Sequence, residues 1–98
     1  KYYDRLKSED PHRSLFFEAS LNAVGYELLF DEKVDESIAV FQLNVKEFPD
    51  SWNTYDSLGE AYLNRGDKQE AIMYYEKSIE LNPENENGIN VVDRLKSE

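Results

Sequence analysis

The sequence has no cysteine and only one histidine, His12. Without cysteine the chain can form neither disulfides nor thiolate metal sites, which leaves its cellular compartment open. A single histidine offers no nucleophile and base that can be paired, so we expect no catalytic residues in this chain. The sequence also lacks a run of roughly 18 apolar residues and a signal peptide pattern, so neither a membrane span nor a signal peptide is predicted.

Basic residues are scarce relative to acidic ones. The chain carries 11 lysines and arginines against 21 aspartates and glutamates, which gives a formal charge of −10. No stripe of basic side chains interrupts this acidic background, whereas binding to phosphates depends on clustered cations. The charge therefore disfavours nucleic acid as a partner, and a membrane surface rich in anionic lipid is disfavoured for the same reason.

Glycine and proline are also few, and their positions carry the strongest architectural signal. Gly25 and Gly59 lie 34 residues apart, as do Pro49 and Pro83. Other side chains recur at the same spacing: the first copy reads Leu21, Val24, Gly25, Leu28, Ser37, Phe41 and Pro49, and the second reads Tyr55, Leu58, Gly59, Tyr62, Ala71, Tyr75 and Pro83. An internal repeat of this length predicts helix-turn-helix units that stack into a solenoid.

Each copy has two apolar stripes at helical spacing. In the first copy the stripes are Leu21, Val24 and Leu28, then Ile38, Phe41 and Val45; in the second they are Tyr55, Leu58 and Tyr62, then Ile72, Tyr75 and Ile79. Small residues face each other across each hairpin: Gly25 with Ser37, and Gly59 with Ala71. They predict that the paired helices approach to about 8–10 Å.

Residues that start or stop helices mark the turns. Gly66 suits the left-handed conformation after a helix, and Pro83 cannot continue the helix before it. Asp67, with Glu70 three residues later, predicts a capping box. Glu32 takes the place of Gly66 in the first copy, where it must either adopt a positive φ or re-route the turn. We therefore expect the two turns to differ slightly.

The repeat divides the chain into a helical domain and an N-terminal segment. We expect the domain at residues 14–98, with repeat 1 at about 18–51, repeat 2 at about 52–85 and a capping helix at about 86–96. In that last helix Ile89, Val92 and Leu95 form an apolar face, and polar neighbours would meet water at the end of the solenoid.

The N-terminal segment fits the repeat least well. We expect residues 1–13 to be a linker or partial helix from a preceding domain, with Ser14 capping the helix that follows. The chain begins at Lys1 without a methionine, so we interpret it as a piece of a longer polypeptide.

One segment, residues 82–88, is dense in oxygen ligands. Its alignment with a calcium-binding loop places Pro83 at the first ligand and Arg94 at the bidentate glutamate, so the match fails at both ends. We expect an inter-repeat turn there, and the sequence predicts neither a metal site nor a cofactor.

On these residues the chain resembles tetratricopeptide repeat proteins over roughly residues 15–96, most strongly from Trp52 to Pro83. The resemblance implies an all-α fold, a right-handed α-α superhelix of two helix-turn-helix repeats plus a C-terminal capping helix. Residues 21–29 and 55–62 are also similar to the C-terminal repeat segment of bacterial serine hydrolases of the esterase or β-lactamase type. That second resemblance implies a bacterial cytoplasmic or periplasmic parent whose catalytic motifs lie outside this chain.

In the tetratricopeptide family the first helices of successive repeats build the concave face. The resemblance therefore implies a partner-binding groove lined by Asn22, Tyr26, Leu29, Phe30, Asn53, Asp56, Glu60, Leu63 and Asn64. A protein or peptide segment would bind there, with the parent catalytic domain as one candidate. Members that bind a chaperone's C-terminal carboxylate use a cationic grip that is missing at the matching positions here.

Two alternatives to this groove stay open. Leu29 and Phe30 could simply pack under the N-terminal segment, because exposed apolar clusters are uncommon on monomers. The chain could also be a structural spacer or a self-association element that forms a homodimer through the same apolar surface.

Overall fold

The computed structural model describes the backbone of residues 11–98 and the side chains of residues 17–98. This part of the chain contains no strand, and its five helices are α2 (Pro11–Phe30), α3 (Val34–Glu47), α4 (Trp52–Arg65), α5 (Lys68–Leu81) and α6 (Glu86–Ser97). The predicted all-α class is confirmed. The linker or partial helix expected at residues 1–13 lies mostly outside the described residues.

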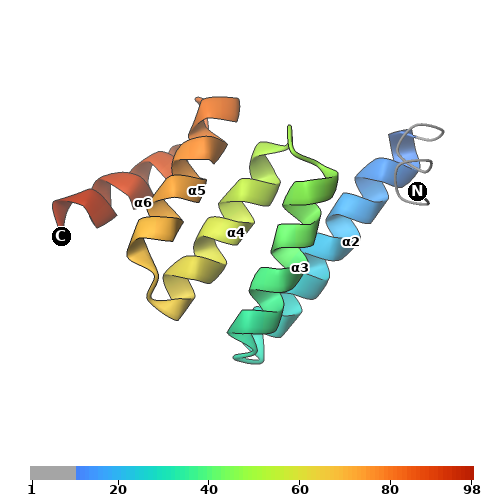
Figure 1. Ribbon diagram of the computed structural model, residues 1–98. Coiled ribbons are helices and arrows are strands. Elements are labelled where there is room, and N and C mark those ends of the chain that lie inside the picture. Colours follow the sequence, from blue (N-terminus) through green and yellow to red (C-terminus); the bar gives the residue numbers. More distant parts are fainter. Residues whose placement is uncertain (1–10) are drawn as a thin grey trace.

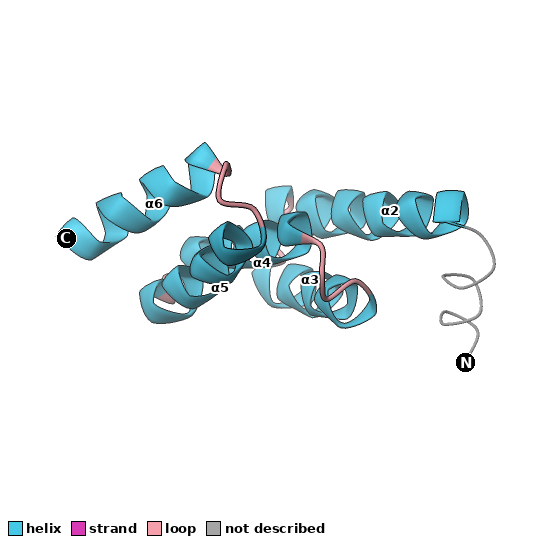
Figure 2. Ribbon diagram, turned by 90° about the horizontal axis from the view of Figure 1, so that it is seen from above, coloured by secondary structure: helices cyan, strands magenta, loops and turns pink. Residues whose placement is uncertain are grey.

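The helices form two antiparallel hairpins, α2 with α3 and α4 with α5, and α6 follows them (Figure 1). Seen from above, α2 and α6 lie on either side of α4, while α3 and α5 lie on the other side of the molecule (Figure 2). The first helices of the repeats therefore share one curved face, and the second helices share the opposite one. This is the arrangement of a tetratricopeptide solenoid with a terminal capping helix.

An aromatic ring packs against a glycine inside each hairpin. A Cβ atom on Gly59 would lie 2.9 Å from Tyr75 Cδ2, and one on Gly25 would lie 2.6 Å from Phe41 Cζ. Both distances are too short for real carbon atoms, so only glycine permits this approach of the two helices. Phe41 and Tyr75 are buried beneath these contacts. The close approach predicted from the two glycines is confirmed.

Ser37, which replaces the small alanine of the second repeat, adds a polar contact to the first hairpin. Its Oγ donates a hydrogen bond of 2.8 Å to the carbonyl oxygen of Gly25, and the residue is fully buried. Ala71, at the same position in the second hairpin, is also fully buried. A small side chain is therefore kept at both positions, and in the first hairpin its hydroxyl is satisfied by the facing backbone.

The two intra-repeat turns have the same geometry despite their different residues. Glu32 adopts a φ of 62° and Gly66 a φ of 92°. In the first turn the amides of Glu32 and Lys33 bond to the carbonyls of Leu29 and Leu28; in the second those of Gly66 and Asp67 bond to Leu63 and Tyr62. This pair of bonds is the Schellman motif, which satisfies the last carbonyls of a helix. The expectation that the turns differ is wrong, because Glu32 accepts the left-handed conformation.

Asp67 precedes α5 but does not cap it through its side chain. Its Oδ2 instead accepts a hydrogen bond of 2.6 Å from Arg65 Nε. The predicted capping box is therefore wrong, because a neighbouring guanidinium competes for the carboxylate with charge assistance that a backbone amide lacks.

The apolar stripe of α2 is less buried than predicted. Val24 is 48% exposed, whereas Leu58, its equivalent in α4, is 1% exposed. Helix α3 packs against α4, and among the described helices none holds the matching place beside α2. The stripe prediction for Val24 is wrong, because burial at this position depends on the preceding helix.

Helix α2 also begins earlier than the sequence suggested. It starts at Pro11, so Ser14 lies within the helix and is not its N-cap. The helix crosses the boundary expected between residues 13 and 14. Proline is favoured in the first turn because its missing N–H would have no partner there.

Helix α6 is fixed to the hairpin before it by an asparagine. Asn85 caps the helix by accepting from the Gly88 amide at 3.2 Å, and its Nδ2 lies 2.9 Å from both Asp56 Oδ2 and Ser78 Oγ. The residues between α5 and α6 therefore form the predicted inter-repeat turn. None of the described helices combines the length and hydrophobicity that a membrane crossing requires.

Candidate partner-binding site

Equivalent positions on successive first helices form rows across the curved face. One row consists of Tyr26 on α2, Glu60 on α4 and Arg94 on α6, each 34 residues after the last. A second row contains Asn22 and Asp56, and a third contains Phe30 and Asn64. Residues of one row occupy equivalent backbone positions on successive first helices, so differences between them come from their side chains.

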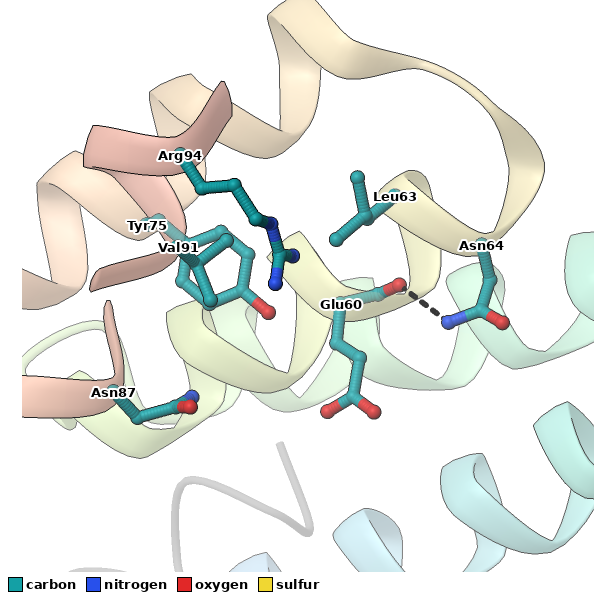
Figure 3. Close-up of a pocket in the computed structure, with 7 residues that line it drawn as sticks. All are labelled: Glu60, Leu63, Asn64, Tyr75, Asn87, Val91 and Arg94. Carbon is teal, nitrogen blue, oxygen red and sulfur yellow. Dashed lines mark hydrogen bonds between the residues drawn. The ribbon is translucent and has the colours of Figure 1, made fainter. Parts of the chain in front are cut away.

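A pocket of about 280 Å³ opens between α4, α5 and α6 (Figure 3). Its walls combine apolar, amide and charged side chains from the three helices: Glu60, Leu63, Asn64, Tyr75, Asn87, Val91 and Arg94. Only Tyr75 comes from a second helix, so the pocket belongs mainly to the face made by the first helices.

Two hydrogen-bond donors in this pocket have no acceptor among the described residues. Arg94 is exposed and forms no ion pair there, and Tyr75 is 2% exposed with no hydrogen bond to its hydroxyl. Figure 3 shows the Tyr75 hydroxyl and the Arg94 guanidinium directed into the same space. Burial, together with the carboxylates of Asp56 and Glu60, raises the pKa of Tyr75, and Arg94 opposes this rise. Tyr75 is therefore a neutral donor at physiological pH.

Glu60 is held toward α2, away from a direct pair with Arg94. The Tyr26 hydroxyl donates to Glu60 Oε1 at 2.8 Å, and the Tyr26 ring packs edge-on against Phe41 with centroids 5.1 Å apart. Burial raises the pKa of Tyr26, and the charge of Glu60 raises it further. A hydrogen bond therefore joins the side chains of Tyr26 on α2 and Glu60 on α4, whereas no bond joins those of Glu60 on α4 and Arg94 on α6.

Two of the predicted groove residues are occupied by structural hydrogen bonds. Ser57 Oγ donates to Asn22 Oδ1 at 2.6 Å, which connects α4 to α2. Asp56 accepts from Asn85 Nδ2, and burial raises the pKa of the Asp56 carboxyl group. Asn22 and Asp56 therefore position helices relative to one another.

The remaining predicted residues on α2 and α4 differ in how open they are. Phe30 is 83% exposed, so its ring is not packed beneath another segment, contrary to one of the alternatives. Leu29 is half-buried and packs against the core. The N-terminal segment under which it was expected to pack lies mostly outside the described residues. Asn53 is half-buried and does not line the pocket. The apolar surface at the end of α2 is therefore supplied mainly by Phe30.

Of the predicted groove residues, Glu60, Leu63 and Asn64 line the pocket. Sequence reasoning missed four others: Tyr75, Asn87, Val91 and Arg94. The repeat itself contained the signal for three of them, since Asn87, Val91 and Arg94 lie 34 residues after Asn53, Ser57 and Glu60. Tyr75 was identified only as a core residue, because the pattern marks its ring and not its hydroxyl.

The site has few features suited to a metal ion. Within residues 17–98, no three histidine, cysteine or acidic side chains gather closely enough to hold one. The polar side chains of the pocket are instead two amides, one hydroxyl, one carboxylate and one guanidinium, all of which can form hydrogen bonds.

Comparison with known proteins identifies the repeat. Residues 57–85 match the model of the tetratricopeptide repeat. Over 49 residues, which is 50% of the chain, the sequence is 41% identical to the human Superkiller complex protein 3. The chain spans 3% of the length of that relative. Residues 57–85 therefore form a tetratricopeptide repeat, in agreement with the helical arrangement of the whole described chain.

Proposed function

We propose that this chain is a non-catalytic module that binds a protein or peptide segment on the face built by α2, α4 and α6. The observation that carries the proposal is the pocket between α4, α5 and α6, in which Arg94 and the Tyr75 hydroxyl have no acceptor among the described side chains. Tetratricopeptide repeats in general present such faces to other proteins, and stacked helix pairs supply surface for binding.

The pocket walls favour a polypeptide over a small molecule. Leu63 and Val91 provide apolar contact, and the carboxamides of Asn64 and Asn87 offer donors and acceptors to a main chain. Asn64 Nδ2 already donates to the carbonyl oxygen of Glu60 at 3.0 Å, which leaves its oxygen and its second N–H for a partner. The exposed ring of Phe30 extends the apolar surface toward α2, beyond the pocket. An extended segment that crosses α4 would reach all of these groups.

The proposal can be tested with a displayed peptide library selected on the full chain. We expect that selected peptides lose at least about tenfold in affinity for Leu63→Asp, because a buried charge would replace apolar contact. Met73→Asp is the matched control, since Met73 is exposed on α5 outside the pocket. Peptides that bind both variants equally, or a selection that yields no peptide, would contradict the proposal.

The origin of the chain is a separate part of this proposal. The similarity of residues 21–29 and 55–62 to the repeat segment of bacterial serine hydrolases favours a parent catalytic domain as an intramolecular partner. The human relative described above lends no support to a bacterial parent. The residues encoded before Lys1 would test this part, since a serine nucleophile motif is expected there.

Self-association is the second candidate function. It is favoured by the exposed ring of Phe30, which is 83% exposed and belongs to the same apolar surface as the proposed groove. Sedimentation velocity over a range of concentrations would show a dimer that Phe30→Asp disrupts. A chain that stays monomeric at the highest concentration would remove this candidate.

A further inference from the structure

The row formed by Tyr26, Glu60 and Arg94 contains one satisfied pair and one unsatisfied pair. Tyr26 and Glu60 are joined at 2.8 Å. Glu60 and Arg94, at the next equivalent step, line the same pocket but form no ion pair within 4.0 Å. Within the described part of the chain, the Arg94 guanidinium therefore has no anion, and it lies next to the Tyr75 hydroxyl, which has no acceptor there.

We infer that the pocket receives the carboxylate of one aspartate or glutamate side chain from a bound segment whose neighbouring residues are neutral or basic. This inference rests on the proposed function. Arg94 and Tyr75 are both donors, and a carboxylate offers two acceptor oxygens that can bond to each of them. A neutral acceptor would satisfy the hydroxyl but would leave the guanidinium charge unpaired.

Glu60 limits the charge of the group that can bind. Glu60 lines the same pocket, and its charge contributes to raising the pKa of Tyr75, so an anion bound at Tyr75 lies within reach of a like charge. A phosphate, with close to two negative charges at neutral pH, would meet more repulsion than a carboxylate with one. The pocket is therefore expected to select aspartate or glutamate over a phosphorylated residue.

The rest of the bound segment is expected to be neutral or basic. The chain carries a formal charge of −10, so an acidic segment would be repelled as it approaches. Asp56 and Glu60 lie one helical turn apart on α4, and no described lysine or arginine pairs with either. A basic residue near the bound carboxylate would approach these two acidic groups. In a bound segment, an acidic side chain would thus complement Arg94, and basic neighbours of that side chain would complement Glu60.

The test uses synthetic peptides with amidated C-termini and one central residue that is Asp, Asn, Lys or phosphoserine. The flanking positions are a random mixture of Ala, Leu, Ser and Lys. On the unmodified chain we expect the Asp pool to bind about tenfold more tightly than the Asn pool, as for a hydrogen-bonded charge. The ratio should fall to about one with Arg94→Gln and to about three with Tyr75→Phe.

Lys46→Gln is the matched control, because it removes one exposed positive charge outside the pocket. The Asp preference should remain about tenfold in this variant. A preference that persists in Arg94→Gln, or that falls equally in Lys46→Gln, would overturn the inference. The same holds if Asn, Lys or phosphoserine binds as well as Asp, or if only a peptide with a free C-terminal carboxylate competes.

The two proposals fail in different ways. If the pools bind the unmodified chain but not Leu63→Asp, and show no preference for Asp, the inference fails and the proposed function stands. If no pool binds the unmodified chain more tightly than Leu63→Asp, both fail. Melting temperatures of Arg94→Gln and Tyr75→Phe should match that of the unmodified chain, since neither substitution removes a packed group.

Discussion

The hairpins α2–α3 and α4–α5 share their internal contact but differ in what lies beside them. In both, an aromatic ring covers a glycine, and in both the turn is closed by the same pair of backbone hydrogen bonds. The second hairpin lies between α3 and α6, whereas the described structure places only α4 and α3 next to α2. The difference shows that the repeat pattern specifies the hairpin, while neighbouring helices decide which of its faces are buried.

The largest expected difference concerns the position shared by Val24 and Leu58. Leu58→Ala should lower the free energy of unfolding by about 3 kcal/mol, because it leaves a cavity at a fully packed site. Val24→Ala should lower it by about 0.5 kcal/mol or less, since that side chain is 48% exposed. Urea unfolding followed by circular dichroism measures both. Equal losses would show that Val24 is covered in solution.

A second pair of substitutions compares the glycine contacts. Gly25→Ala should destabilise the chain by about 2 kcal/mol and Gly59→Ala by about 1 kcal/mol. Both figures are net values, which already include a gain of about 1 kcal/mol from the higher helix propensity of alanine. The ordering follows from the deeper overlap of a Cβ with Phe41 than with Tyr75. Phe41→Leu should partly rescue Gly25→Ala. Stabilisation by either single substitution would contradict the close contact.

Substitutions in the two intra-repeat turns should change the free energy of unfolding in opposite directions. Glu32→Gly should raise the free energy of unfolding by about 1 kcal/mol, because it relieves a positive φ of 62°. Gly66→Ala should lower it by a similar amount, about 1 kcal/mol, since it creates the same strain in the second turn. Thermal and urea denaturation of the two variants provide the measurement. A loss of stability in Glu32→Gly would mean that the glutamate side chain has a compensating role.

The smallest effect concerns pH and the junction with α6. Burial raises the pKa of Asp56 above its ordinary value of 3.8, so the folded state binds its proton more tightly than the unfolded state. The stabilisation from this group is complete below pH 3.8 and is lost as the pH rises through the raised value. Asp56→Asn should therefore gain stability relative to the unmodified chain over that interval, by about 0.5 kcal/mol or less.

The outcome for Asp56 can be read from unfolding free energies at several pH values. Asn22→Asp is a useful contrast, because it places a new carboxylate at the equivalent position of α2. A difference between Asp56→Asn and the unmodified chain that is constant with pH would show that the carboxyl group titrates alike in both states.

Most of the fold could be predicted because its signals are local and repeated. Gly25, Gly59 and the facing rings give the hairpins, and Pro83 gives the end of the second one. The turn at Glu32 could not be predicted in the same way, since strain of about 1–2 kcal/mol is small beside the hydrogen bonds and packing of two helices. The prediction that Asp67 caps α5 was wrong for a related reason. The Arg65 guanidinium, which binds the Asp67 carboxylate in place of a backbone amide, is apparent as a competitor only in the structure.

The site was less predictable than the fold. Glu60, Leu63 and Asn64 followed from their place on a first helix, and one more step of the same spacing reaches Arg94. The roles of Asn22 and Asp56 could not be inferred, because whether an amide or carboxylate is free depends on partners such as Ser57 and Asn85. Spacing identifies which face a residue occupies, but hydrogen bonding decides whether it is available.

The proposed site gives Tyr75 a second role besides packing. Its ring packs directly against Gly59 of α4, and its hydroxyl points into the pocket beside Arg94. Loss of binding in Tyr75→Ala would therefore not identify Tyr75 as a ligand contact, because removal of the buried ring would also disturb the hairpin. Tyr75→Phe removes only the oxygen atom and so separates the two roles. Phe41, at the equivalent position of the first repeat, shows that a ring without a hydroxyl fills this place in the hairpin. Under the proposed function, exchange of tyrosine and phenylalanine at position 75 would therefore change affinity and leave the scaffold unchanged.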